Sequence, residues 1–252
     1  MSAVSADLHT HTTASDGTLT PSELVASAVA VGLDVLAVSD HDSVEGVPSA
    51  LRAAEGFALT VVPAVELSAH EEGRDVHVLG YFIDYEDATL TERLFELRRG
   101  RLERAIAMID ALDDAGYAVS IDDVLAHSGE GAVGRSHVAR ALVDRGSAAS
   151  VNEAFSDLIG RDRPFYRRKP LVEPAQVVGL IHDAGGLAVL AHPCVGGVAD
   201  LLSDMTAAGL DGLEAYHPEH TPADTSRMLK TARELDLLVT GGSDYHGDTG
   251  SY

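Results

Sequence analysis

The 252-residue chain has one cysteine, no long apolar run and few basic residues, and each shortage excludes a class of protein. Cys194 has no second cysteine to pair with, which excludes an internal disulfide and fits a reducing compartment. The apolar stretches are about six to ten residues long, well below the roughly twenty that span a bilayer. Residues 1–8 lack the basic region and apolar core of a signal peptide. These features predict a cytoplasmic protein without a membrane segment.

Basic side chains are also outnumbered, because 18 lysines and arginines face 40 aspartates and glutamates, for a formal net charge of −22. Such a charge repels nucleic acid at long range, so we expect no stable nucleic-acid complex, and any phosphate must be held by a few local groups. Bound divalent cations would offset part of the charge, with some of the carboxylates as their ligands. The composition therefore leaves room for metals, and the spacing of the twelve histidines decides whether they take part.

Short apolar or β-branched runs alternate with amphipathic stretches, which is typical of repeated βα units around a parallel sheet. Pro21 follows a candidate N-cap, Thr20, and Gly32 ends the same pattern, so residues 20–32 are predicted to form the first helix. A chain of this length can bury a large core as one domain. We predict an α/β barrel with seven strands, at residues 5–9, 34–39, 59–66, 75–82, 187–191, 211–216 and 237–243.

The segment between the fourth and fifth predicted strands, residues 88–180, is too long for a simple crossover. Its helical periodicity predicts a helical insertion over the mouth of a barrel made from residues 1–87 and 181–252. The predicted helices are 90–115, 121–127, 135–145 and 151–159. In the first of them, the charged residues Arg93, Arg98, Arg99, Arg101, Glu103 and Arg104 are expected to form a solvated face with helix ion pairs.

Side chains of metal-binding type lie at or near the ends of the predicted strands. His9 and His11 are two residues apart on a strand, so both rings point to one face and can reach one metal. An isolated histidine would be a surface or structural residue, which is how we interpret His70, His127, His182 and His220. The joint pattern differs, because strand ends are where an α/β barrel converges on its active site. It predicts a metal centre that includes His9, His11, Asp16, His41, Glu66, His77, His192, Asp244 and His246.

Asp40 and Asp42 flank His41 and have two interpretations. They could orient the His41 ring through a hydrogen bond, as ligating histidines usually require. Asp40 could equally cap a loop.

The motifs, in this order along the chain, resemble those of the PHP (polymerase and histidinol phosphatase) superfamily. They are His-x-His at 9–11, Ser-Asp-His-Asp at 39–42, Val-Glu-Leu-Ser at 65–68, Gly-Arg-Ser-His at 134–137, Ala-His-Pro at 191–193 and Gly-Ser-Asp-Tyr-His at 242–246. The resemblance spans residues 6–247 and implies a distorted seven-stranded barrel that holds up to three divalent metals. It implies one metal on His9, His11, Glu66 and Asp244, a second on Asp16, His41 and His246, and a third on Glu66, His77 and His192.

The resemblance also implies that Arg135, His137 and His217 face the phosphate, with water activated by metal as the nucleophile. His217 and His137 are rival candidates for the general acid. Manganese is the favoured metal, although mixed histidine and carboxylate ligands accept iron and zinc as well.

Within the superfamily, the chain is most similar to the bacterial phosphoesterases that remove the 3′-phosphate from nucleoside 3′,5′-bisphosphates. This implies a hydrolase for the phosphate monoester of a small nucleotide, with AMP-like nucleotides and short RNA ends as further candidates. The basic run at 161–169 could hold a second phosphate through Arg167 and Arg168. One alternative is a histidinol-phosphate phosphatase, and another is a non-catalytic metal-binding module. An amidohydrolase is disfavoured, because neither Lys169 nor Lys230 closes a predicted central strand.

Overall fold

The computed structural model describes residues 4–71, 73–129, 131–168 and 172–247. Seven strands form one sheet in the order β1 to β7. Backbone hydrogen bonds from Leu8 N to Gly241 O and from His11 N to Tyr245 O join the first strand to the last, so the sheet curls into a nearly closed barrel. The predicted α/β barrel is confirmed. Its strands are β1 (Ala6–Asp7), β2 (Val35–Val38), β3 (Thr60–Glu71), β4 (Arg74–Tyr81), β5 (Leu187–Leu190), β6 (Gly212–Tyr216) and β7 (Leu238–Gly241).

β4 departs from the expected pattern of parallel βα units. It pairs antiparallel with both β3 and β5, whereas the other neighbouring strands pair in parallel. Only residues 72 and 73 separate β3 from β4, too few for the crossover that a parallel pair needs. β3 also continues to Glu71, so Glu66 lies within the strand rather than at its end. Because β4 runs in reverse, the half of the strand that carries His77 lies at the mouth of the barrel.

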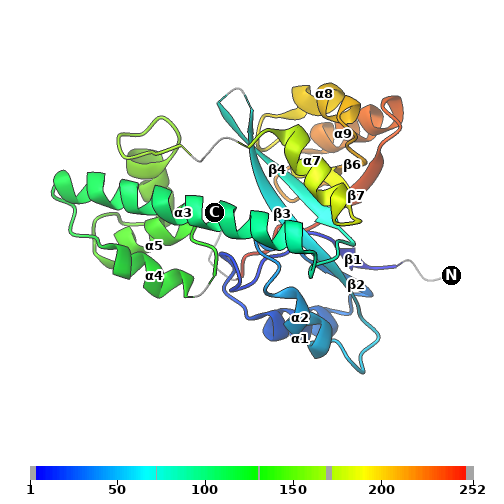
Figure 1. Ribbon diagram of the computed structural model, residues 1–252, viewed down its shortest axis with the longest axis horizontal. Coiled ribbons are helices and arrows are strands. Elements are labelled where there is room, and N and C mark those ends of the chain that lie inside the picture. Colours follow the sequence, from blue (N-terminus) through cyan, green and yellow to red (C-terminus); the bar gives the residue numbers. More distant parts are fainter. Residues whose placement is uncertain (1–3, 72, 130, 169–171, 248–252) are drawn as a thin grey trace.

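Helices at both sides of the barrel cover its outer surface (Figure 1). The first, α1 (Pro21–Val31), begins after Thr20, whose side chain accepts a hydrogen bond from Glu23 N, and ends at Gly32 with φ 79°. The predicted first helix is thus confirmed. α1 packs against α2 (Val47–Ala53), and α7 (Pro174–Asp183) packs on β3, β4 and β5. The 3₁₀ turn η2 (Ala199–Leu201), α8 (Leu202–Ala207) and α9 (Pro222–Glu234) complete this layer, with α9 against β6.

The helices of residues 88–159, called the cap below, gather at one end of the molecule, except that the first part of the long helix runs back along the barrel, where Leu90 and Leu94 join the barrel core (Figure 1). Its elements are α3 (Ala88–Asp114), α4 (Ile121–Ser128), α5 (Arg135–Asp144), α6 (Val151–Glu153) and the π-helix η1 (Ala154–Ile159). The cap has its own hydrophobic core, in which Met108, Leu112 and Leu142 are fully buried. α7 falls within the predicted insertion 88–180 but packs on barrel strands. The long helix α3 therefore connects two separately packed bodies.

In the described part of the chain, no helix combines the length and apolar character needed to cross a bilayer.

Candidate metal centre and substrate pocket

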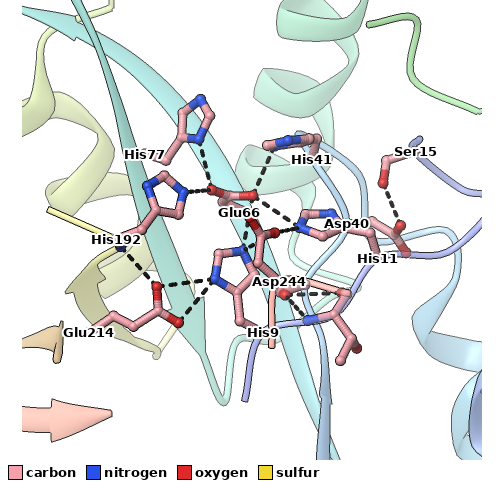
Figure 2. Close-up of polar contacts among 12 residues, drawn as sticks. His9, His11, Ser15, Asp40, His41, Glu66, His77, His192, Glu214 and Asp244 are labelled. Atoms are coloured by element: carbon pink, nitrogen blue, oxygen red, sulfur yellow. Dashed lines mark hydrogen bonds and ion pairs between the residues drawn. The ribbon is translucent and has the colours of Figure 1, made fainter. Parts of the chain in front are cut away.

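Glu66 lies at the centre of a cluster of histidine rings (Figure 2). Its Oε2 atom is 3.3 Å from Nε2 of His9, 3.3 Å from Nε2 of His11 and 3.0 Å from Nδ1 of His41. The residue comes from β3, whereas the three rings follow β1 and β2, where the backbone leaves the sheet. Parallel pairing of these strands thus brings the four side chains together at one edge.

The other oxygen of Glu66 faces a second set of rings. Oε1 is 2.8 Å from Nδ1 of His77 and 3.2 Å from Nε2 of His192. Glu66 is only 1% exposed, so solvent does not screen these contacts. A carboxylate that presents each oxygen to different imidazoles has the geometry of a ligand shared between metal ions.

Two further carboxylates complete the cluster. Asp244 Oδ1 is 3.3 Å from His9 Nε2 and 3.0 Å from His11 Nε2. Asp16 Oδ1 is 3.2 Å from His246 Nε2. Among the residues that the structure describes, three groups of ligand atoms are close enough together to hold an ion: His9, His11, Glu66 and Asp244; His11, Asp16, His41 and His246; and His41, Glu66 and His77.

These groups compare closely with the ligand sets implied by the resemblance. The first is the same, and the second gains His11. The third has His41 where His192 was expected, although His192 lies beside the same carboxylate oxygen. Assignment of each ligand to a particular ion stays a prediction.

Unsatisfied buried atoms show that this donor set fits metal ions. Within the described residues, His9 Nε2, His41 Nδ1, Glu66 Oε2 and Asp16 Oδ1 are buried, and despite the short distances above they have no partner with hydrogen-bond geometry. Buried polar atoms normally have such partners, and imidazole nitrogens with carboxylate oxygens are the ligands that transition metals accept.

Neighbouring carboxylates raise the pKa of two histidines in the cluster, His9 and His246. Burial works against protonation of His9, but Glu66 and Glu214 outweigh it and hold the pKa of His9 well above normal. Burial likewise opposes a protonated His246, yet Asp16 raises its pKa to about 10. Metal ions would compete with these protons for the same nitrogens.

Glu214 was missed at the sequence level. It is fully buried in β6, and its Oε1 lies 3.1 Å from His9 Nδ1, while Oε2 accepts a 2.8 Å hydrogen bond from His192 N (Figure 2). It therefore fixes the His9 ring so that Nε2 points at Glu66, as carboxylates behind ligating histidines do. An acidic residue inside an otherwise apolar strand was the available signal.

Asp40 and Asp42, on either side of His41, make different contacts. Asp40 accepts hydrogen bonds from Thr12 N at 2.7 Å, Thr12 Oγ1 at 2.7 Å and Ser15 Oγ at 2.6 Å. It thus fixes the loop that leads to Asp16, in line with the loop-capping interpretation. Asp42 accepts from Ser68 N at 2.8 Å and pairs with the buried Arg101 of the cap.

The cluster opens into a pocket of about 470 Å³ between barrel and cap. Asp16, His41, His77, Asp244 and His246 line one side, called the metal floor below. Arg101, Arg104, Arg135 and Phe155, which come from the cap, also line the pocket and are called the cap wall.

Two cap-wall residues correct the expectation that the arginines of α3 form a solvated face. Arg101 and Arg104 are only 8% and 7% exposed, and their spacing of three places them on one side of the helix. The expectation holds for Arg93 and Arg99, which pair with glutamates on the outer surface. Repeated arginines along a helix do not reveal which face another part of the fold will cover.

Arg135, at the start of α5, and His217, directly after β6, are the two residues expected to face the phosphate that lie at the pocket. Both line the pocket, and Arg135 Nη2 is 3.3 Å from Asp75 Oδ2. His217 Nδ1 accepts a hydrogen bond from Glu219 N at 3.2 Å. In the neutral ring the proton is then on Nε2, which lies 3.5 Å from Asp244 Oδ2.

His137 does not lie with them. It is 1% exposed, is absent from the pocket lining, and its Nδ1 accepts a hydrogen bond from Gly134 N at 3.0 Å. Burial lowers its pKa to about 4. The side chain thus caps the start of α5 instead of facing a substrate.

The predicted second-phosphate residues are also outside the pocket lining. Arg167 Nη1 donates to the carbonyls of Pro164 and Tyr166 in its own loop, and Arg168 is exposed. Lys169, the last residue of the basic run, lies outside the described residues. The histidines expected to be structural all have contacts: His70 with Asp75, His127 with Asp144, His182 with Asp211 and His220 with Ala215 O.

Comparison with known proteins agrees with this geometry. The family model for the PHP domain matches residues 7–201. The chain belongs to the PHP family. This PHP chain is 35% identical over 245 residues to a 5′-3′ exoribonuclease of Haemophilus influenzae, covering 95% of this chain and 89% of the relative. It is 34% identical to a 3′,5′-nucleoside bisphosphate phosphatase of Chromobacterium violaceum, covering 95% and 86%.

A solved structure extends the agreement to the fold. An inferred metal-dependent phosphoesterase from Bifidobacterium adolescentis matches with a TM-score of 0.90 and 35% identity, covering 98% of this chain and 89% of the other. The PHP chain described here is accordingly a metal-dependent hydrolase of phosphate esters.

Proposed function

We propose that this PHP enzyme hydrolyses the phosphate monoester of a small nucleotide, with the 3′-phosphate of a nucleoside 3′,5′-bisphosphate as the preferred group. The observation that supports this most directly is the pocket itself, which sets a metal floor centred on Glu66 against a wall of arginines. Metal ions and guanidinium groups both stabilise phosphate oxygens. A similar protein is named for this substrate.

The proposal includes two or three divalent ions, with manganese favoured and iron or zinc accepted by the same ligands. His9, His11, Glu66 and Asp244 would hold one of them, and Asp16, His41 and His246 would hold another. Bound ions of this kind lower the pKa of water towards neutrality and offset the charge of phosphoryl oxygens.

Arg135 and His217 supply the remaining chemistry. The forked guanidinium of Arg135 matches the geometry of phosphate oxygens and would hold the group that is cleaved. Of the two candidates for the general acid, His217 lines the pocket. Because the Glu219 backbone N–H occupies Nδ1, the ring is neutral there, and His217 would stabilise the leaving oxygen by a hydrogen bond from Nε2–H rather than by giving up that proton. His137 is a weaker candidate because its pKa of about 4 leaves it without a proton to donate at neutral pH.

In the proposed reaction a water oxygen attacks phosphorus and the bond from phosphorus to the ribose 3′ oxygen breaks. The attacking water releases a proton, the leaving oxygen takes up a proton from water, and the Nε2–H of His217 would stabilise that oxygen by a hydrogen bond. The products are inorganic phosphate and a nucleoside 5′-monophosphate. The reaction is placed in the cytoplasm, in line with the single cysteine of the chain.

A second candidate substrate is a short RNA end, which is favoured by the similarity to an exoribonuclease. The net charge of −22 would repel long RNA, so only short fragments are expected to compete with a small nucleotide.

A substrate comparison tests the proposal. Manganese-loaded enzyme would be assayed with adenosine 3′,5′-bisphosphate, 5′-AMP, histidinol phosphate and a short RNA, with products identified by phosphorus NMR. We expect kcat/KM for the bisphosphate to exceed the others by at least about tenfold, with 5′-AMP as product. A preference for histidinol phosphate, or release of the 5′-phosphate, would contradict it.

A further inference from the structure

The cap wall contains three arginines, and they differ in how their charge is balanced. Arg101 pairs with Asp42, and Arg135 lies 3.3 Å from Asp75. Arg104 forms no ion pair with any carboxylate of the described residues. Arg104 is therefore the cation of the wall without a carboxylate at ion-pair distance, although Asp75 acts on it from further away.

The contacts of Arg104 explain part of its position but not all of it. Its Nε donates a 2.6 Å hydrogen bond to Arg167 O, and its guanidinium lies 5.2 Å from the ring centre of Tyr166. These two contacts hold the loop before residue 168 against α3. Nη2, by contrast, is buried without a hydrogen-bond partner among the described residues, and the side chain is only 7% exposed.

A buried guanidinium nitrogen without a partner is costly unless something else satisfies it. Burial and the neighbouring Arg135 lower the pKa of Arg104 to about 10, so the side chain is still a cation at neutral pH. Because Arg104 lines the pocket, an anion that enters it can pair directly with the guanidinium, and a rotation of that group would let the anion accept a hydrogen bond from Nη2.

The wall lies at a suitable distance from the metal floor. Arg135 stacks on Tyr166, as Arg104 does, and contacts Asp75 on β4. His77, two residues further along the same face of β4, contacts Glu66 in the metal cluster. Two residues of a strand span roughly 7 Å, so an anion on the wall would be about one nucleotide away from a phosphate on the floor.

We propose that Arg104 is a specificity-determining residue that binds a second phosphate of the substrate, so that the pocket selects nucleotides with phosphates on both sides of the ribose. This inference rests on the proposed function for the identity of the cleaved phosphate. It assigns to Arg104 the role expected of Arg167 and Arg168, which do not line the pocket.

The test compares two substrates that share the cleaved group. The ratio of kcat/KM for adenosine 3′,5′-bisphosphate to that for 3′-AMP would be measured for the manganese-loaded wild type, Arg104→Gln and Arg104→Lys. Arg99→Gln, on the exposed side of the same helix, is the matched control. In Arg104→Gln the ratio should fall about 10- to 100-fold, as expected for the loss of a hydrogen bond to a charged group. Arg104→Lys should lose less, and the control should keep the wild-type ratio.

An unchanged ratio in a folded Arg104→Gln would overturn the inference. A wild-type ratio near one would also overturn the inference, and this measurement does not depend on whether a variant folds. If the wild type hydrolyses no nucleotide, the proposed function fails, and calorimetric titration of the same two compounds into wild type and Arg104→Gln still tests the subsite. A preference for the bisphosphate that depends on Arg104 would support the inference, and equal binding of both compounds would contradict it.

Discussion

The two sides of the pocket are built in different ways. The metal floor consists of carboxylates and imidazoles from the barrel, and Glu66 at its centre pairs with Leu79 of β4 on one side and forms an isolated bridge to His41 on the other. The cap wall consists mainly of arginines on helices of a body with a separate core. Chemistry on the barrel and selection on the cap would let substrate preference change without disturbing the metal ligands.

The largest expected effect comes from removing one carboxylate of the metal floor. Asp244→Asn removes a carboxylate that faces both His9 and His11, so activity on every substrate should fall on the order of 1,000-fold or more. Steady-state assays with circular dichroism as a check on folding would measure this. Asp236→Asn, in an exposed turn, is the control. Near-native activity of Asp244→Asn would show that the ligand set is wrong.

A cavity in the cap core should lower the stability of the protein but leave metal binding unchanged. Leu142 is fully buried there, so Leu142→Ala should lower the free energy of unfolding by about 2–5 kcal/mol. Denaturant unfolding measures the change, and Ile106→Ala on the outer side of α3 is the control. Metal content per folded protein should not change, because the two cores are separate. Loss of bound metal in a folded Leu142→Ala would mean that cap and floor are coupled.

His137 makes the stability of the cap depend on pH. Its pKa is about 4 in the folded protein, against about 6.5 in an unfolded chain. The unfolded state therefore takes up the proton first, and the stability present above pH 6.5 is lost as pH falls towards 4, by up to about 3 kcal/mol.

The variant His137→Asn keeps an acceptor for Gly134 N but cannot titrate in this range. Urea unfolding at several pH values between 7 and 4 should show a shallower decline for the variant than for wild type. Parallel curves would argue against a neutral buried His137.

Glu214 should have the smallest effect of this series. Glu214→Gln keeps the side-chain shape but removes the negative charge behind His9, so metal affinity should fall about 10- to 100-fold. Competition with a chelator measures the affinity, and Glu234→Gln on the exposed side of α9 is the control. Unchanged affinity would mean that Glu214 serves only the packing of β6.

The contrast between the metal floor and the cap wall also explains which parts of the site could be predicted from the sequence. Candidate ligands such as His9, His11 and His41 could be found because short strands end in polar residues, and alternation along a strand places residues two apart on a common face. The reversal of β4 was missed, although the short segment between the predicted strands 59–66 and 75–82 is already too short for the crossover of a parallel pair. The burial of Arg101 and Arg104 depends on contacts between distant segments, which leave no periodic signal in an arginine-rich helix.

The account depends on a shared carboxylate between several metal ions. The most direct test is elemental analysis of the purified protein after loading with manganese and removal of free metal. Two or three equivalents per chain are predicted, because Glu66 presents its two oxygens to separate sets of imidazoles. A reproducible value of one equivalent or less would contradict the multinuclear centre on which the account of this pocket depends.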